Sequence, residues 1–233
     1  MPETSEYPHP ELLETTEWLA AHLDDADLVV VDARRPEEYA EGHIPGALNL
    51  ASPVFKAEGS LETCSAEEFA EVVGALGIRP TDTVICYDAG GPIAARLWWA
   101  FTRFGHEQTR YLHGGLRKWI EEGRPLETAP PTRSPVTYQL GAQREELACT
   151  LPQAIERLGS DDVLFWDTRS EEEFTGARAM NNPEHRVGHI PRAIHLEWSE
   201  LADPATGLFR PAEETREVLA AKGITPEQEI VTY

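Results

Sequence analysis

The chain has 233 residues, with 41 Asp and Glu against 20 Lys and Arg, and a formal net charge of -21. Long-range repulsion therefore disfavours nucleic acid and anionic membranes as binding partners. No apolar run approaches the roughly 18 residues that cross a bilayer, and the N-terminal region lacks the basic and apolar parts of a secretory signal, so we expect a cytoplasmic protein.

Apolar runs and helical spacing alternate along the first half of the chain. Residues 28–31, 47–50 and 84–87 are short apolar runs that predict buried strands, and residues 65–76 and 93–104 have helical spacing. This alternation predicts an α/β fold, with a mainly parallel sheet flanked by helices.

A long internal repeat organises the chain. The heptapeptide EGHIPGA at Glu41–Ala47 returns as VGHIPRA at Val187–Ala193, and the same offset of 146 later matches Tyr87 with Tyr233. A repeat of this length predicts that each copy is a domain with its own core.

Upstream of the heptapeptide the offset is shorter. Asp32-Ala-Arg34 returns as Asp167-Thr-Arg169 at an offset of 135. The second copy therefore carries an insertion of 11 residues before Gly188.

The repeat predicts the domain boundaries. We expect a first domain at 1–126, a linker at 127–140 that contains Pro130, Pro131 and Pro135, and a second domain at 141–233. A complete second copy would end near residue 272, so we expect the second domain to be incomplete.

The loop after the predicted strand 84–87 is the first candidate for chemistry. Two glycines and the start of the next helix can direct several backbone N–H groups at one point, which makes an anion cradle. Asp88 stands at its base, and we interpret it as a carboxylate that accepts hydrogen bonds from the loop. General-base chemistry is the alternative.

Other reactive side chains have structural interpretations. Cys86 lies within the predicted strand, where we expect it to be buried and inert. The three cysteines form no disulfide framework or zinc pattern. His43 and His189 each lie in a Gly-His-Ile-Pro turn, so we interpret them as turn residues and expect no metal or cofactor.

Several motifs together resemble the rhodanese family. They are Asp-x-Arg at 32–34, Gly-His-Ile-Pro-Gly-Ala at 42–47, the strand and loop around Tyr87, and His-Gly-Gly-Leu-x-x-Trp at 113–119. The resemblance covers nearly the whole chain and implies two tandem rhodanese-like domains, of the kind found in thiosulfate and 3-mercaptopyruvate sulfurtransferases.

The resemblance implies a catalytic cysteine directly after Tyr233, whereas the first copy carries the noncatalytic Asp88 at the corresponding position. The cysteine would take sulfur from a donor as a persulfide and pass it to cyanide or another thiophilic acceptor. The chain to Tyr233 lacks that cysteine, so we expect it to be inactive by itself.

Many members of the family have an arginine where Glu173 stands here, and a carboxylate at that position cannot pair with an anionic donor. We expect Arg169 or Arg186 to supply the cationic contact with the donor. The sequence leaves thiosulfate and 3-mercaptopyruvate open as donors, and a two-domain member of this family is compatible with a monomer.

Two other functions compete with sulfur transfer. A noncatalytic binding or regulatory module is one, because neither copy has a cysteine at the nucleophile position within this sequence. A cysteine-dependent phosphatase is the other, and the position of Ala94, six residues beyond Asp88, departs from its pattern of a loop closed by arginine.

Overall fold

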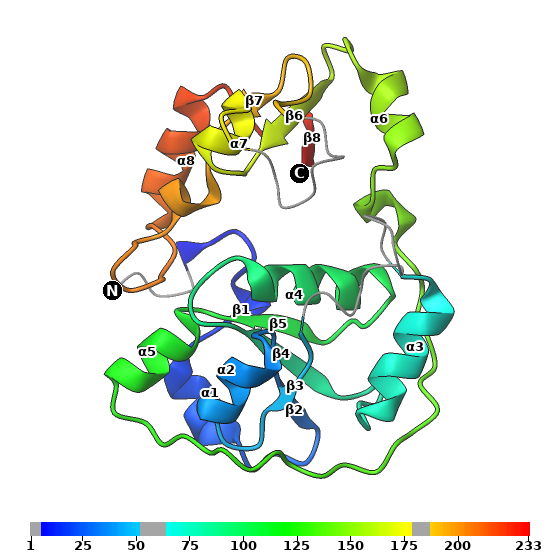
Figure 1. Cartoon of the computed structure of the whole chain (residues 1–233), viewed down its shortest axis with the longest axis vertical. Helices are drawn as coiled ribbons and strands as arrows, with labels where there is room; N and C mark the ends of the chain where they lie inside the picture. The colour runs from blue at the N-terminus through cyan, green and yellow to red at the C-terminus, as the bar shows by residue number, and fades with distance from the viewer. Residues whose placement is uncertain (1–5, 52–63, 179–186) are drawn as a thin grey trace. The chain divides into compact units, whose positions relative to one another are not determined.

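The computed structural model describes residues 6–51, 64–178 and 187–233. Its packing divides the chain into two compact units (Figure 1). Unit 1 comprises Met1–Leu147 with Ala205–Leu208, and unit 2 comprises Ala148–Pro204 with Phe209–Tyr233. The linker predicted at 127–140 lies within unit 1 by this division.

Unit 1 is built on a parallel sheet of five strands. Their order is β1-β5-β4-β2-β3, and each neighbouring pair is parallel. The strands are β1 (Leu13–Glu14), β2 (Leu28–Asp32), β3 (Leu48–Asn49), β4 (Thr83–Tyr87) and β5 (Thr109–Leu112). The predicted α/β fold with a parallel sheet is confirmed.

The register of the central strands determines which residues meet at the end of the sheet. Asp32 pairs with Tyr87 on β4 and with Asn49 on β3. Because the strands are parallel, their carboxyl ends lie along one edge, where ligands bind in open α/β sheets.

Helices cover both faces of this sheet (Figure 1). They are α1 (Thr16–His22), α2 (Pro36–Glu41), α3 (Ala66–Ala75), α4 (Ile93–Arg103) and α5 (Gly115–Glu121), with short 3₁₀ turns η2 (Pro10–Leu12) and η4 (Glu145–Leu147). The helix α3 begins at a capping box in which Ser65 and Glu68 satisfy each other's backbone N–H groups.

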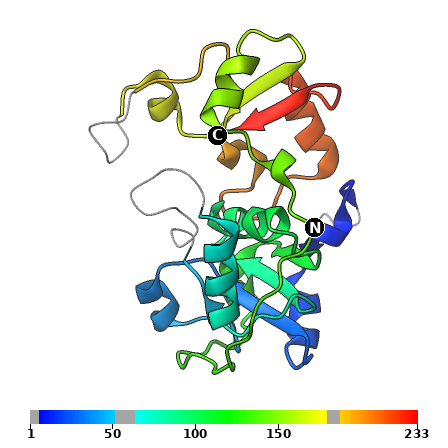
Figure 2. The ribbon, with the colours of Figure 1, turned by 90° about the vertical axis from the view of Figure 1, so that its right-hand side faces the viewer.

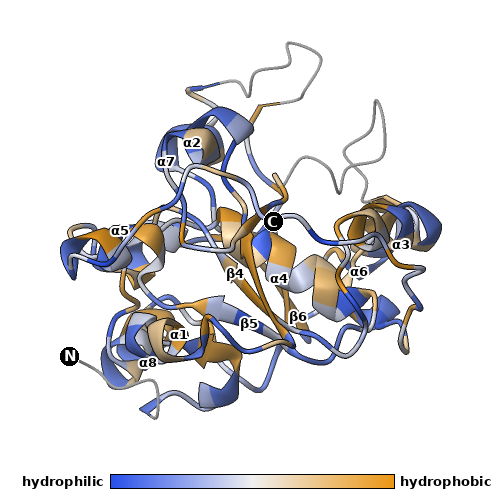
Figure 3. Ribbon diagram, turned by 90° about the horizontal axis from the view of Figure 1, so that it is seen from below, coloured by the Kyte–Doolittle hydropathy of each residue, from blue (hydrophilic) through white to orange (hydrophobic). Residues whose placement is uncertain are grey.

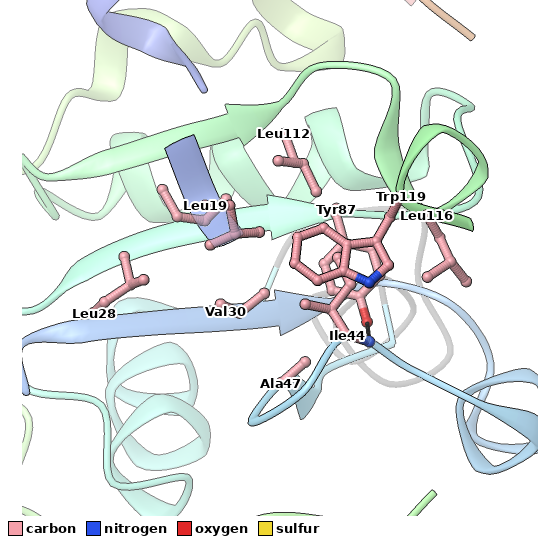
Figure 4. Packing of buried hydrophobic residues seen from close by; sticks show 10 residues of the cluster. Leu19, Leu28, Val30, Ile44, Ala47, Tyr87, Leu112, Leu116 and Trp119 are labelled. Carbon is pink, nitrogen blue, oxygen red and sulfur yellow. Dashed lines mark hydrogen bonds between the residues drawn. The ribbon is translucent and has the colours of Figure 1, made fainter. Parts of the chain in front are cut away.

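The two faces have separate cores. On one face Trp119 of α5 and Leu19 of α1 pack with Val30, Ile85 and Tyr87 of the central strands (Figure 4). On the other face an aromatic cluster joins α3 to α4. Its members are Phe69, Phe101, Phe104 and Tyr138.

Strand residues contribute side chains to both cores. Side chains of successive strand residues point to opposite faces, so every residue of β2 is buried. Figure 3 shows the apolar colour along β4 and hydrophilic colour on the outer sides of α3 and α5.

The segment predicted as a linker has specific contacts with unit 1. The amide of Val136 donates to the carbonyl of Gly74 at 2.9 Å, and the hydroxyl of Tyr138 lies 2.7 Å from Nδ1 of the buried His106. Arg133 forms an ion pair with the fully buried carboxylate of Asp82. These contacts hold the segment along α3.

Unit 2 has a three-stranded parallel sheet in the order β7-β6-β8. Its elements are α6 (Leu151–Arg157), β6 (Val163–Asp167), α7 (Glu171–Thr175), β7 (Ile194–His195), η5 (Trp198–Leu201), α8 (Ala212–Ala221) and β8 (Glu229–Thr232). Figure 2 shows the red arrow of β8 beside β6. The order matches β3-β2-β4 of unit 1, with each strand at the offset expected from the repeat.

Across residues 6–51, 64–178 and 187–233, none of the helices combines the length and apolar character that crossing a membrane requires.

The close approach of the 127–140 segment to α3 generates a stability prediction. A Cβ atom added at Gly74 would lie 2.5 Å from the carbonyl oxygen of Val136. Alanine in a helix interior is otherwise favoured over glycine by about 0.5–1 kcal/mol. We expect Gly74→Ala nevertheless to lower the free energy of unfolding by about 1–3 kcal/mol, because the backbones must separate.

Urea unfolding measures this change. The exposed Glu71→Ala on the same helix is the matched control, and we expect its effect to stay within about 0.5 kcal/mol. A Gly74→Ala protein as stable as the unsubstituted one, or more stable, would contradict the packing described here.

Candidate active site

Asp88 stands where the central strand β4 meets the loop that leads into α4. Its carboxylate is 1% exposed. Oδ1 accepts hydrogen bonds from the amides of Gly90 and Gly91 at 2.7 and 2.6 Å, and Oδ2 accepts one from Ala94 at 2.8 Å. Negative charge is favoured at the N-terminal end of a helix. The interpretation of Asp88 as a carboxylate that satisfies loop N–H groups is confirmed.

The surroundings of Asp88 act on its ionisation in two directions. Burial raises the pKa of the carboxyl above its usual range, and the hydrogen bonds from the loop amides act against that shift. The loop amides that could bind an external anion already donate hydrogen bonds to Asp88. The cradle of unit 1 is therefore filled by the protein's own carboxylate.

The loop that follows β5 packs against the Asp88 loop. The amide of Leu116 donates to the carbonyl of Asp88 at 2.8 Å. Gly115 has a φ of +56°, and a Cβ at this position would lie 2.6 Å from the same carbonyl. The Gly-Gly pair at 114–115, which follows β5, is the sequence feature that corresponds to this close approach.

A buried carboxylate joins the three loops at this end of unit 1. Asp32 is fully buried and accepts hydrogen bonds from Arg34 Nη2 and from the Tyr87 hydroxyl, both at 2.6 Å. Arg34 also donates to the carbonyl of Gly42, and the amide of Ile44 donates to Tyr87 Oη (Figure 4). The Asp-x-Arg motif thus connects the ends of β2 and β4 with the Gly-His-Ile-Pro turn.

Unit 2 repeats this network with its own residues. Arg169 Nη2 donates to Asp167 at 2.6 Å and to the carbonyl of Gly188 at 2.9 Å, and the amide of Ile190 donates to Tyr233 Oη at 2.9 Å. Burial raises the pKa of Asp167, but hydrogen bonds from Arg169 and Tyr233 outweigh it, so the pKa lies below its usual range. Asp167 is therefore ionised at neutral pH and pairs with the Arg169 guanidinium.

Most of the contacts of the Arg169 guanidinium belong to this network. Besides Nη2, its Nε donates to Asp167 at 3.0 Å, and its guanidinium lies 5.2 Å from the ring centre of Tyr233. The side chain is about one-fifth exposed, at 21%. The other predicted donor-binding residue, Arg186, lies outside the described residues. Their binding of a donor remains a prediction.

Glu173, which stands where many family members have arginine, has a local role in unit 2. The Ser170 hydroxyl donates to its carboxylate at 2.8 Å, and Arg178 forms an ion pair with it at 3.3 Å. The hydrogen bonds from Ser170 hold the pKa of Glu173 below its usual range. The carboxylate caps the first turn of α7.

The paired histidines stabilise turns, as the sequence analysis predicts. Nδ1 of His43 lies 3.0 Å from the carbonyl of Tyr39, and the two rings stack with centroids 3.8 Å apart. His189 contacts Phe174 in the same way, with Nδ1 2.8 Å from its carbonyl and the same ring separation. In the part of the chain that the structure describes, no three acidic, histidine or cysteine side chains are arranged to hold a metal ion.

The cysteines of unit 1 are buried and poorly reactive. Cys86 is fully buried in β4, as predicted, and burial raises the pKa of its thiol far above neutrality. Burial also raises the pKa of the Cys64 thiol. Neither thiol has the ionised form that a nucleophile at neutral pH requires.

Sequence comparison places these features among known proteins. A family model described as a rhodanese-like domain matches residues 15–122 and 150–233. The chain is 33% identical to the sulfur carrier protein TtuD of Thermus thermophilus, over 97% of this chain and 83% of that protein. It is 34% identical to a thiosulfate sulfurtransferase of Pseudomonas aeruginosa, over 92% and 79%. A putative thiosulfate sulfurtransferase, SseA, of Mycobacterium tuberculosis is also 34% identical, over 100% and 80%.

Solved structures share the fold. The wild-type structure of EanB matches with a TM-score of 0.86 at 24% identity, over 97% of this chain and 60% of its own. The anaerobic ergothioneine biosynthesis enzyme of Chlorobium limicola, in complex with trimethyl histidine, matches with a TM-score of 0.85 at 23% identity. The chain spans about three fifths of the length of these structures.

The filled cradle of unit 1 predicts the effect of changing Asp88. In Asp88→Asn an amide N–H₂ group replaces one carboxylate oxygen. At least one loop amide then has an N–H₂ donor in front of it and no oxygen that accepts its hydrogen bond. Loss of an acceptor for buried amides costs about 1–3 kcal/mol. We expect a decrease of that size in the free energy of unfolding, measured by urea denaturation at neutral pH.

The exposed Asp24→Asn makes the same chemical change away from the loop. We expect it to alter the free energy of unfolding by no more than about 0.5 kcal/mol. Equal stabilities for the Asp88 and Asp24 variants would show that the loop amides do not depend on the carboxylate.

Proposed function

The chain belongs to the rhodanese-like domain family, and from that premise we propose that it is a thiosulfate sulfurtransferase. It moves the outer sulfur of thiosulfate to cyanide or to another thiophilic acceptor. The observation that carries the proposal is the loop at Asp88, in which three backbone amides converge on one anion. Relatives named thiosulfate sulfurtransferase, at 34% identity over most of the chain, support the same class of activity.

The proposed nucleophile is a cysteine directly after Tyr233, at the position that Asp88 occupies in the first copy. Tyr87 ends β4 and Tyr233 directly follows β8. The hydroxyl of each accepts a hydrogen bond from the corresponding turn amide, Ile44 or Ile190. A loop that stabilises a carboxylate through backbone amides would equally stabilise a thiolate. Such donors lower the pKa of a thiol and make it nucleophilic at neutral pH.

The reaction proceeds in two transfers. In the first, the thiolate attacks the outer sulfur of thiosulfate, a new S–S bond forms, and sulfite leaves with the electron pair of the broken bond. In the second, cyanide attacks the terminal sulfur of the cysteine persulfide, thiocyanate leaves, and the thiolate is restored. Backbone amides stabilise the thiolate in both steps, so the chemistry uses no metal or cofactor.

The donor is an anion, and a cationic side chain would bind it. Arg169 and Arg186 are the proposed contacts, because Glu173 cannot pair with an anionic donor. The same arginines would bind the carboxylate of 3-mercaptopyruvate, which is the alternative donor. A noncatalytic binding module is the alternative function, and it would follow if the position after Tyr233, like that of Asp88 in the first copy, holds no cysteine.

Sulfur uptake tests the proposed activity directly. We expect the protein that carries this sequence together with the residues after Tyr233 to gain the mass of one sulfur atom after incubation with thiosulfate and removal of free reagent. Cyanide should remove that mass, and peptide mapping should locate it in the peptide that follows Tyr233.

Cys149 is the partly exposed cysteine of unit 2, so Cys149→Ser is the control. This variant should take up sulfur as the unsubstituted protein does. A protein that gains no sulfur from thiosulfate would contradict the proposed activity, and uptake from 3-mercaptopyruvate in its place would identify the alternative donor.

Donor binding by the arginines predicts a selective effect on KM. We expect Arg169→Ala and Arg186→Ala each to raise the KM for thiosulfate by about tenfold, as expected for loss of a charge-assisted hydrogen bond of about 1.5 kcal/mol. Steady-state kinetics of thiocyanate formation measure this change.

Arg34→Ala is the matched control for Arg169→Ala, because Arg34 makes the same contacts in the first copy. It should cost similar stability and leave the KM unchanged. If the KM for thiosulfate is the same in all three variants and in the unsubstituted protein, neither Arg169 nor Arg186 binds the donor.

A further inference from the structure

A buried histidine of unit 1 contacts two segments that lie far from it in the sequence. His106 stands between α4 and β5 and is 2% exposed. Its Nε2 lies 2.7 Å from the carbonyl oxygen of Asp82, and its Nδ1 lies 2.7 Å from the hydroxyl oxygen of Tyr138. Asp82 directly precedes β4, and Tyr138 belongs to the 127–140 segment. Both ring nitrogens of His106 are therefore hydrogen-bonded inside unit 1.

These two partners determine where the neutral imidazole carries its proton. A backbone carbonyl can only accept a hydrogen bond, so Nε2 of His106 carries the proton and donates it to Asp82. Nδ1 then has a free lone pair, which accepts the hydrogen bond that the Tyr138 hydroxyl donates. A second proton, on Nδ1, would remove that acceptor. The hydrogen bond from Tyr138 to His106 therefore requires the neutral ring.

The side chains packed around His106 disfavour a charged ring. Phe101 of α4 meets it edge-on at a centroid distance of 5.4 Å, and the Tyr138 ring lies nearly parallel to it at 6.1 Å. Phe69 of α3 packs on both Phe101 and Tyr138. Burial among these groups lowers the pKa of His106 from its ordinary value of about 6.5.

One carboxylate acts against this shift. The charge of Asp82 and the hydrogen bond to its carbonyl favour the protonated ring, but burial outweighs both effects on the pKa of His106. Arg79 and Arg133 already form ion pairs with the Asp82 carboxylate, at 2.8 and 2.9 Å. The acidic neighbour of His106 in the chain, Glu107, is exposed to solvent. With the segment packed as described, His106 is therefore neutral at neutral pH.

The chain stays close to His106 beyond Tyr138. Glycine at position 141 lets the backbone pass so near to Gly105 that an added Cβ atom would overlap the Gly105 carbonyl oxygen. Unit 2 begins shortly afterwards, at Ala148. The contact of Tyr138 with His106 therefore lies on the stretch of chain that leads from unit 1 into unit 2.

We propose that His106 and Tyr138 form an acid-sensitive latch, which holds residues 138–141 on unit 1 at neutral pH and releases them in mild acid. This inference is independent of the proposed function. In the closed latch the neutral ring accepts the hydrogen bond of the Tyr138 hydroxyl. On release, Nδ1 takes a proton from solvent and the imidazolium is hydrated; no covalent bond of the chain changes. The free connection between the two units becomes longer.

The direction of the pH dependence follows from the number of bound protons. The closed latch keeps the pKa of His106 below its ordinary value, and release lets the pKa return towards about 6.5. The open form therefore binds more protons below that pH. The closed latch is fully stable above pH 6.5 and loses stability as the pH falls through that value.

Hydrogen exchange followed by mass spectrometry tests the latch in the full chain. The amides of Val136 and Arg144 donate to the carbonyls of Gly74 and Arg103, so their protection from exchange reports whether the segment is closed. We expect the protection factors of peptides that contain these amides, corrected for the intrinsic pH dependence of exchange, to fall about three- to tenfold from pH 7.5 to pH 5.5. Tenfold is roughly the limit for one histidine at one pH unit below its ordinary pKa.

Three variants separate the latch from other effects of pH. His106→Gln keeps a donor and an acceptor but gains no proton in this range, so its segment should have the same protection at both pH values. His22→Gln is the matched control, because Nδ1 of His22 also lies 2.7 Å from a backbone carbonyl, and the pH dependence of the segment should remain. Tyr138→Phe removes only the hydroxyl, and should lower the protection at pH 7.5 about three- to tenfold, as expected for loss of one ordinary hydrogen bond.

Several outcomes would overturn the latch. One is a protection of the segment that does not change between the two pH values, and another is a His106→Gln protein that keeps the full change. A third is equal protection of the segment and of the buried strand β2, since the segment would then separate only when unit 1 unfolds. If His106→Gln does not fold, Tyr138→Phe decides, and unchanged protection at pH 7.5 in that variant would show that the hydroxyl does not hold the segment.

Discussion

The pairing of one buried carboxylate with an arginine and a tyrosine holds the functional end of unit 1 together. Asp32 is fully buried, and its carboxylate pairs with Arg34 and accepts a hydrogen bond from the hydroxyl of Tyr87. Breaking such a pair by removing one partner typically costs about 3–5 kcal/mol, because an uncompensated charge stays buried. The arginine and the tyrosine each make a further bond, to Gly42 and from Ile44, so the same carboxylate fixes the turn between α2 and β3. Three segments distant in sequence thus depend on a single group.

This network places the start of the next loop. With the end of β4 fixed by Tyr87, Asp88 enters the cradle formed by the loop amides, and the close approach of Gly115 closes the cradle from the side of β5. In unit 2, Asp167 and Tyr233 repeat the arrangement at the end of β8. Both copies therefore have the same hydrogen-bond network around the tyrosine that precedes the loop.

Sequence patterns that act locally predicted much of this fold. The apolar runs located β2 and β4 and the helical spacings located α3 and α4, each within about one residue. The carboxylate role of Asp88 and the turn role of His43 followed from local chemistry. Features that depend on distant contacts were not predictable. The strand β1 has two residues, and β5 includes Thr109 and Arg110, so neither forms an apolar run. The packing of the 127–140 segment depends on the pairing of Tyr138 with His106, which no spacing reveals.

A carboxylate and a thiolate would use such a cradle of backbone amides in different ways. A carboxylate has two oxygens, and those of Asp88 together accept hydrogen bonds from the amides of Gly90, Gly91 and Ala94. A thiolate has one sulfur and accepts weaker hydrogen bonds, so the same loop leaves donors for a bound oxyanion. The residue at this one position thus decides between a loop that stabilises itself and a loop that stabilises a reacting group. On this argument the scaffold of the two copies can stay the same while the residue at this one position differs.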